Sequence, residues 1–332
     1  MAPLEQDSVE LTAREPSAKT PRSRSVPRRR TRLVRGPLTI GEPAPPINVR
    51  LSVVDPYRPD TVADGGEAFG LVTRAASVRG LFKRYLGGSR QDDFCLQLHV
   101  PTRTLLVAVA DGVSASPRSH LGAALAVRQA AAAAVRQLEA GAAELDWSEV
   151  FSQAAWALVE EHRRACSDSS ASVEDAAASL ATTLAVAALT ADEADSDGHS
   201  TCDGARPEKY RLQVGAVGDS PTLVLSQGKF VRVVGDEGDP DGLIGGGVEA
   251  LPRHTNPSVT EPRTLEPEDV LLVCTDGLAL PLADGKGEVG RTLIRELANP
   301  PDIVDFARLL DFSRSTYDDD RTLVAVWPQA RR

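Results

Sequence analysis

Several features are missing from this sequence, and each absence excludes a class of protein. No apolar run approaches the roughly 18 residues that a membrane-spanning helix needs, so we expect no membrane span. The four cysteines are scattered, without the paired spacing of a zinc site, and the N-terminus lacks the pattern of a secretion signal. Both observations predict reduced thiols and a cytoplasmic location.

Common catalytic motifs are also missing. The chain has no Gly-x-Ser-x-Gly elbow of a serine hydrolase and no Gly-x-x-x-x-Gly-Lys loop for nucleotide phosphates. Its five histidines do not recur at ligand spacing, and His120 is the one closest in sequence to the acidic residues considered below. These absences argue against a zinc centre and against a nucleophilic serine.

Charge is distributed unevenly along the chain. Residues 1–36 carry +5 while the whole chain carries −10, so the remainder carries −15. Because its start is rich in Arg, Pro and Ser, we interpret 1–48 as a disordered basic arm. Such an arm either contacts nucleic acid, anionic lipid or an acidic partner, or is simply solvated. A connector over 49–74 and one folded domain over 75–328 follow, with ordered structure from about residue 67. The acidic domain argues against nucleic acid as a required partner.

The apolar pattern predicts strand pairs that alternate with helix pairs. A polar loop over 190–210 and a Gly/Pro-rich flap over 237–252 interrupt it. This order is typical of an α+β fold with antiparallel sheets and not of parallel βαβ units. The predicted strands are 92–100, 104–110, 180–189, 211–220, 221–227, 229–236, 269–275 and 322–327, and the predicted helices are 121–141, 146–166, 287–298 and 301–313.

Two of the predicted strands end on the same dipeptide. The apolar run 105–110 leads into Asp111 and Gly112, and the run 270–274 leads into a second Asp-Gly pair at Asp276. Asp-Gly is a common turn dipeptide, so a single such ending favours a turn. The repetition after two fully apolar strands favours a site shared by the strand ends.

Other aspartates also lie at predicted strand ends, and a sheet can bring such ends together. Converging carboxylates repel one another unless a cation lies between them. Oxygen ligands suit Mg²⁺ or Mn²⁺ better than zinc. Two such ions can hold a bridging water, lower its pKa and support in-line attack on phosphorus. The aspartates are Asp92, Asp111, Asp219, Asp276 and Asp319.

The order of these motifs resembles the metal-dependent protein phosphatases of type 2C. The matching stretches are QDDF, VADG, ATTLAVAAL, VGDSPTLVL, LLVCTDGL and DDDRTLVAV, and they span roughly residues 75–327. The resemblance implies a four-layer α-β-β-α sandwich of two antiparallel sheets flanked by helix pairs. It also implies a monomeric, bacterial-type serine/threonine phosphatase with two Mg²⁺ or Mn²⁺ ions. Such an enzyme hydrolyses phosphorylated proteins by direct attack of a metal-bridging hydroxide.

The resemblance also assigns roles to single residues. Asp111 matches the catalytic aspartate that bridges both metals, and the carbonyl of Gly112 matches its partner ligand. Asp276, preceded by Thr275 where the family has serine, and Asp319 would complete the first metal site. Of the three consecutive aspartates in the last motif, Asp319 fits best.

The second metal has fewer candidate ligands. Gln91 and Asp92 resemble the acidic pair near that metal, and the resemblance implies that Asp92 is both a metal ligand and a catalytic residue. Asp92 and Asp93 point to opposite faces of a strand, so only one of them can face the site, and we favour Asp92. Asp219 matches a motif that supports the site from outside, although it could equally cap a turn.

Some family residues are absent. Val113 stands where the eukaryotic members have a histidine, and the phosphate-binding arginine has no equivalent unless Arg84 or Arg90 replaces it. Ala178 stands where many members have an aspartate of a third metal site, with Asp175 as an uncertain replacement. These departures leave a second hypothesis open, a catalytically weak or inactive module that binds phosphorylated partners.

Overall fold

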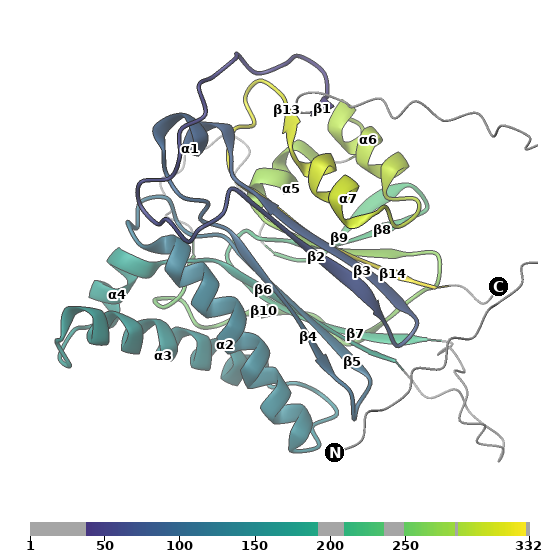
Figure 1. The fold of residues 1–332 in the computed structure, drawn as a ribbon. Coiled ribbons are helices and arrows are strands. Elements are labelled where there is room, and N and C mark those ends of the chain that lie inside the picture. Colours follow the sequence, from purple (N-terminus) through teal and green to yellow (C-terminus); the bar gives the residue numbers. More distant parts are fainter. Residues whose placement is uncertain (1–37, 192–208, 236–248, 283–284, 330–332) are drawn as a thin grey trace, which may run out of the picture. The chain divides into compact units, whose positions relative to one another are not determined.

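The computed structural model describes residues 38–191, 209–235, 249–282 and 285–329. All of them belong to one compact unit, which spans 37–332. Within this unit two antiparallel sheets lie face to face, and helices cover the outer face of each (Figure 1). The predicted fold class, α+β with two antiparallel sheets between helices, is therefore confirmed.

The first sheet holds the strand that ends at Asp111. The long strands of this sheet lie in the order β4-β5-β6-β7, and β5 is the strand that ends next to Asp111. The short strands β10 and β11 both pair with β7. Strands β4 and β5 form the expected hairpin. The bounds are β4 Asp93–His99, β5 Thr104–Ala110, β6 Leu184–Ala191, β7 Tyr210–Val217, β10 Ser258–Val259 and β11 Arg263–Leu265.

The second sheet holds the strand that precedes Asp276. Its order is β2-β3-β14-β12-β8-β9, and every neighbouring pair is antiparallel. The bounds are β2 Thr61–Ala68, β3 Leu71–Val78, β8 Thr222–Ser226, β9 Lys229–Val234, β12 Val270–Cys274 and β14 Arg321–Pro328.

Helices α2, α3 and α4 pack on the first sheet, and α5, α6 and α7 pack on the second (Figure 1). The six-residue helix α1 follows β3, and β1 pairs with β13 in a small parallel ladder. The bounds are α1 Leu81–Leu86, α2 Ser119–Glu139, α3 Trp147–Cys166, α4 Val173–Leu180, α5 Asp276–Leu282, α6 Glu288–Glu296, α7 Ile303–Leu310, β1 Leu38–Thr39 and β13 Phe312–Ser313.

The central strands are apolar throughout because both of their faces are buried. In β5, Val107 and Val109 pack between the sheets, whereas Leu106 and Ala108 pack under the helices. Strand β12 alternates in the same way between the two layers. Successive side chains of a strand point to opposite faces, so only a strand covered on both sides needs an unbroken apolar run.

The structure departs from the predicted elements at the start of the domain. Strand β2 and part of β3 lie within 49–74, which was predicted as a connector, and β2 begins before the predicted start of order near residue 67. The sequence of β2, TVADGGEA, reads as a loop because this edge strand is largely exposed and needs no apolar face.

Helix ends follow the local chemistry of the sequence. Asp146 caps α3 by accepting a hydrogen bond from the backbone N–H of Glu149 at 3.2 Å. Helix α4 was not predicted, although Ser172 and Asp175 form a complete capping box at its start. Most of the predicted loop 190–210 and of the predicted flap 237–252 lies outside the described residues.

Candidate active site

Strands β5 and β12 come from different sheets, and their ends bring Asp111 and Asp276 together. Both residues line one cavity, and burial and the charge of Asp276 both contribute to the raised pKa of Asp111. The backbone around Asp111 is held by Thr183, whose N–H donates to the Asp111 carbonyl at 2.8 Å and whose Oγ1 accepts from the Asp111 N–H at 3.1 Å. The two Asp-Gly endings therefore belong to one place in the fold.

The glycine after each aspartate allows a close approach of two backbones. A Cβ atom at Gly112 would lie 2.9 Å from the carbonyl oxygen of Gln91 and from Ser119. A Cβ atom at Gly277 would collide with the carbonyl oxygen of Asp320. Neither glycine has a positive φ. Turn formation, the simpler explanation of the Asp-Gly pairs, is therefore not what requires glycine at these positions.

A cavity of about 270 Å³ opens beside these strand ends. Its walls contain four aspartates from four separate segments of the chain, so residues more than 200 positions apart meet in it. The lining residues are Asp111, Gly112, Val113, Ser114, Ala115, Thr183, Asp219, Asp276 and Asp319.

Ionised carboxylates are unfavourable in this cavity when no cation compensates their charge. Burial raises the pKa of Asp111 well above its ordinary value, and the negative charges of Asp92 and Asp276 raise it further. A group that binds its proton this firmly lies where negative charge is poorly compensated. A cation in the cavity would supply the missing compensation.

Asp92 lies in the interior beside the cavity. It is fully buried, and its Oδ2 accepts hydrogen bonds from Thr275 Oγ1 at 2.8 Å and from Thr322 Oγ1 at 2.9 Å. Burial, followed by the charge of Asp320, raises the pKa of Asp92 to about 7, although Lys83 acts in the opposite direction. Thr275, noted in the sequence as a replacement for serine, thus fixes the orientation of this carboxyl group.

The neighbouring Asp93 points elsewhere. Its carboxylate forms an ion pair with Arg58 at 2.8 Å, away from the residues that line the cavity. The charge of Asp92 acts on Asp111, whereas Asp93 is paired with Arg58. The two neighbouring side chains thus point to different sides, as they do along a strand.

The three consecutive aspartates also have different environments. Asp319 lines the cavity and its side chain is 50% exposed, whereas the side chain of Asp320 is 1% exposed. Asp320 accepts hydrogen bonds from the N–H groups of Gly80 at 2.7 Å and Gln91 at 2.6 Å. Asp320 thus joins separate segments of the backbone, a role that no sequence pattern indicated.

A lysine that was not considered in the sequence lies between these carboxylates. The Nζ atom of Lys83 is 2.7 Å from Asp319 Oδ1 and 3.0 Å from Asp320 Oδ2. Burial alone would lower the pKa of Lys83, but the charges of Asp320, Asp319 and Asp92 outweigh it and raise the pKa above its ordinary value. Lys83 is therefore a permanent cation at the edge of the site.

The two arginines considered as replacements for the family's phosphate-binding arginine do not reach the cavity. Arg84 pairs with Asp60 at 2.6 Å and with Asp311 at 2.7 Å. Arg90 is buried, where it donates to Ser77 Oγ and to the carbonyl of Asp92. Neither of them is among the cavity-lining residues.

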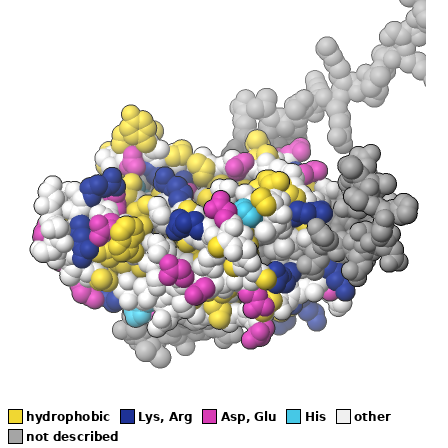
Figure 2. All heavy atoms as spheres, turned by 90° about the horizontal axis from the view of Figure 1, so that it is seen from below, with side chains coloured by type: hydrophobic (Ala, Val, Ile, Leu, Met, Phe, Trp, Pro, Cys, Tyr) yellow, Lys and Arg dark blue, Asp and Glu magenta, His cyan; other side chains and the backbone are white. Residues whose placement is uncertain are grey.

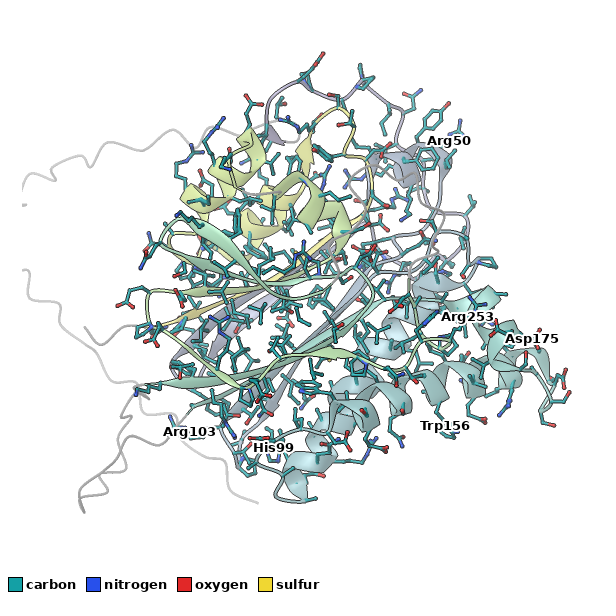
Figure 3. The ribbon with its side chains drawn as sticks, turned by 180° about the vertical axis from the view of Figure 1, so that it is seen from behind. Arg50, His99, Arg103, Trp156, Asp175 and Arg253 are labelled. Carbon is teal, nitrogen blue, oxygen red and sulfur yellow. The ribbon has the colours of Figure 1, made fainter. Side chains whose placement is uncertain are left out.

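Three further residues considered in the sequence do not line the carboxylate cavity, namely Asp175, His120 and Gln91. Asp175 closes the capping box of α4 and lies out on the helical layer (Figure 3), so it does not replace a ligand near Ala178. His120 is buried with its Nε2 atom 3.8 Å from Asp55, and it does not line the cavity. Gln91 donates from Nε2 to Ser119 Oγ at 2.9 Å.

The donor set of the cavity fits a hard divalent cation. The Oδ1 atoms of Asp92 and Asp276 are buried, and within the described ranges neither has a hydrogen-bond partner. Buried polar atoms normally have a partner, so these oxygens are available to a ligand. Oxygen donors are the ligands that Mg²⁺ and Mn²⁺ prefer. Within the same ranges, no group of three or more His, Cys, Asp or Glu side chains already has the geometry of a metal site.

Comparison with known proteins identifies the family. The sequence profile of the family described as "Protein phosphatase 2C" matches residues 79–320, which is most of the chain. The chain therefore belongs to the protein phosphatase 2C family, and the resemblance seen in the sequence motifs is confirmed. No curated protein matches the chain closely enough to add to this assignment.

Solved phosphatase structures are similar to this chain at low sequence identity. The Ser/Thr phosphatase MsPP of Mycobacterium smegmatis is 20% identical, with 79% of this chain and 99% of that chain covered and a TM-score of 0.49. The catalytic domain of the phosphatase PstP, in complex with two manganese ions, is 18% identical, with 78% and 99% covered and a TM-score of 0.48. A phosphatase from Toxoplasma gondii is 14% identical, with 81% and 96% covered and a TM-score of 0.51. At these identities the likeness concerns the fold alone.

Two further observations concern the charge on the surface and the possibility of a membrane span. On the face seen from below, acidic and basic side chains alternate without a broad area of one sign (Figure 2). No helix in the described ranges is long and apolar enough to cross a membrane.

Proposed function

We propose that this chain is a metal-dependent phosphatase that hydrolyses phosphoserine and phosphothreonine in proteins, with two Mg²⁺ or Mn²⁺ ions. One observation carries the proposal: Asp111, Asp219, Asp276 and Asp319 line a single cavity in a chain of the protein phosphatase 2C family. Bound divalent ions would lower the pKa of a water molecule and offset the charge of a phosphoryl group.

The residues of the cavity and the adjacent Asp92 have distinct roles in this proposal. Asp111, central among the carboxylates, would hold both ions, with the Gly112 carbonyl, Asp276 and Asp319 as further ligands. Asp92 would accept a hydrogen bond or a proton through Oδ1, because Thr275 and Thr322 already bind its Oδ2. This division keeps one oxygen of Asp92 oriented by the protein and leaves the other for the reaction.

Removal of divalent ions is expected to abolish turnover. The full-length chain should hydrolyse p-nitrophenyl phosphate and a phosphothreonine peptide in Mn²⁺, lose both activities in EDTA, and recover them when excess Mn²⁺ is added. Calorimetric titration of the metal-free chain with Mn²⁺ measures binding without reference to activity. Full activity in EDTA would show that the cavity does not work through metal ions.

The adjacent pair Asp92 and Asp93 supplies a matched comparison. Asp92→Asn should lower turnover by about 10- to 100-fold, the usual effect of losing a carboxylate that orients a metal site. Asp93→Asn should leave turnover unchanged, because Asp93 pairs with Arg58 outside the cavity. Steady-state rates of ester hydrolysis at saturating Mn²⁺ test both. The opposite ranking of the two variants would assign the site to Asp93.

The competing hypothesis is a module that binds phosphorylated partners without hydrolysing them. One observation favours it: Lys83 already donates to Asp319, one of the proposed ligands. Such a module would bind a phosphopeptide in anisotropy titrations and would show no turnover of any phosphate ester with Mn²⁺ or Mg²⁺. Metal-dependent turnover excludes it.

A further inference from the structure

A second cavity lies next to the carboxylate cavity. Its volume is about 240 Å³, and it shares Ser114 and Asp319 with the first. The shared residues make the two cavities neighbours along one surface. The lining residues of the second cavity are Phe82, Lys83, Leu86, Gly88, Gln91, Ser114, Asp318 and Asp319.

Helix α1 forms one wall of this second cavity and is firmly held. Lys83 binds Asp319 and Asp320, and Arg84 binds Asp60 and Asp311, so two successive side chains tie the helix to the domain. On its other side the backbone N–H of Arg50 donates to the carbonyl of Arg84 at 2.9 Å, and Figure 3 shows Arg50 beside the helix. The wall is thus ordered before any ligand arrives.

The same helix exposes large apolar side chains. Phe82 is 55% exposed and Leu86 is 53% exposed, although both line the cavity. Tyr85 and the adjacent Leu51 and Val53 are also exposed and extend the apolar surface away from the site. A group of exposed apolar side chains beside a cavity indicates a surface that binds another molecule.

The charges of the second cavity restrict what can bind there. Lys83 is already paired, and the remaining charged residues of the lining are the carboxylates of Asp318 and Asp319. An acidic side chain would be repelled by them, whereas an apolar one would cover Phe82 and Leu86. The cavity shares Ser114 and Asp319 with the one where a phosphoryl group would be bound, so a single ligand molecule can reach both.

We infer that this second cavity binds a bulky apolar side chain of the phosphorylated polypeptide, close in sequence to the phosphorylated residue. The inference rests on the proposed function, since it places the phosphate in the carboxylate cavity. An extended peptide advances about 3.3 Å per residue. The apolar side chain is therefore expected within three residues of the phosphoserine or phosphothreonine, and the chain would select substrates by this neighbour.

Binding of non-hydrolysable phosphopeptides tests the inference independently of turnover. Fluorescent peptides with a difluoromethylene phosphonate in place of the phosphate would carry Leu, Gly or Asp at each position from −3 to +3. The full-length chain with Mn²⁺ should bind the best Leu peptide about tenfold more tightly than its Gly counterpart, the discrimination that an apolar pocket provides. The Asp peptide should bind most weakly.

Two variants of the second cavity and one control variant complete the experiment. Phe82→Ser and Leu86→Ser alter exposed side chains, and both should lose the preference for Leu while they keep wild-type turnover of p-nitrophenyl phosphate. Val100→Ser is the matched control, because Val100 is 66% exposed and follows the end of β4 opposite to Asp92. It should keep the preference.

The possible outcomes separate the inference from the proposed function. Equal binding of Leu and Gly peptides at every position, or a preference that survives in both pocket variants, overturns the inference even if the ester is hydrolysed. A Leu preference lost in Phe82→Ser supports it even if no ester is hydrolysed, in which case only the proposed hydrolysis fails. A dimer in light scattering that Phe82→Ser dissociates, without peptide selectivity, would assign the surface to a second copy.

Discussion

Replacement of Asp111 by Asn is expected to lower metal-dependent hydrolysis by about 10²- to 10³-fold, as for other groups that compensate charge in a transition state. Asp111 is buried beside three other carboxylates, those of Asp92, Asp276 and Asp319. An amide at this position cannot supply the negative charge that two cations require. Ester hydrolysis over a range of Mn²⁺ concentrations measures the loss. Full turnover in the variant would contradict the assignment of the cavity as a two-metal site.

The same substitution should stabilise the metal-free protein at neutral pH. The pKa of Asp111 is raised in the folded state, so its contribution to stability is fully present below its pKa in the unfolded chain and is lost as the pH rises through the folded pKa. Asn does not ionise, so the melting temperature of the variant should exceed that of wild type at pH 8, and the difference should shrink toward pH 4.

Addition of Mn²⁺ should reverse this order, because a ligand that binds the folded state stabilises it. Wild type should gain more in melting temperature than Asp111→Asn when Mn²⁺ is added at pH 8. Asp93→Asn is the control for the loss of one carboxylate outside the cavity, and its gain should equal that of wild type. Equal gains in all three proteins would show that Asp111 does not bind the ion.

The sequence predicted the aspartates of the candidate site, such as Asp111 and Asp276, but not Lys83 beside them. Asp111 and Asp276 follow strands whose unbroken apolar runs reflect burial on both faces, so the ends of these strands are visible in the sequence alone. The choice of Asp92 followed from the resemblance of Gln91 and Asp92 to the family's acidic pair, and the alternation of side chains added only that Asp92 and Asp93 cannot both face the site. The strand ends need only local pattern and the geometry of a strand, whereas the roles of the single aspartates came from the family resemblance.

The parts that were missed depend on distant contacts. Lys83 lies in a six-residue helix, too short to show a helical period, and its partners are 236 and 237 positions away. Strand β2 is exposed and contains two glycines, so only its pairing with β3 makes it a strand. Tertiary pairing decides such segments, and a single sequence does not record it.

Replacement of Lys83 by Met is expected to cost about 3–5 kcal/mol of unfolding free energy, the usual effect of removing one partner of a buried ion pair. Met fills a similar volume but leaves the carboxylate of Asp320 buried without its cation. The half-exposed Asp319 contributes little to this loss, since water replaces the ammonium group there. Urea unfolding of the metal-free chain at pH 7.5 gives the free energy directly.

A double-mutant cycle with Asp320→Asn isolates the pair from the other effects of each substitution. Asp320→Asn alone is also expected to destabilise the protein, because one amide oxygen cannot accept from Gly80, Gln91 and Lys83 together. In the Lys83→Met background, Asp320→Asn removes the uncompensated charge. The double variant should therefore lose less unfolding free energy than the two single variants lose together. Strictly additive losses would mean that Lys83 and Asp320 do not stabilise each other, and that α1 is held in place by Arg84 instead.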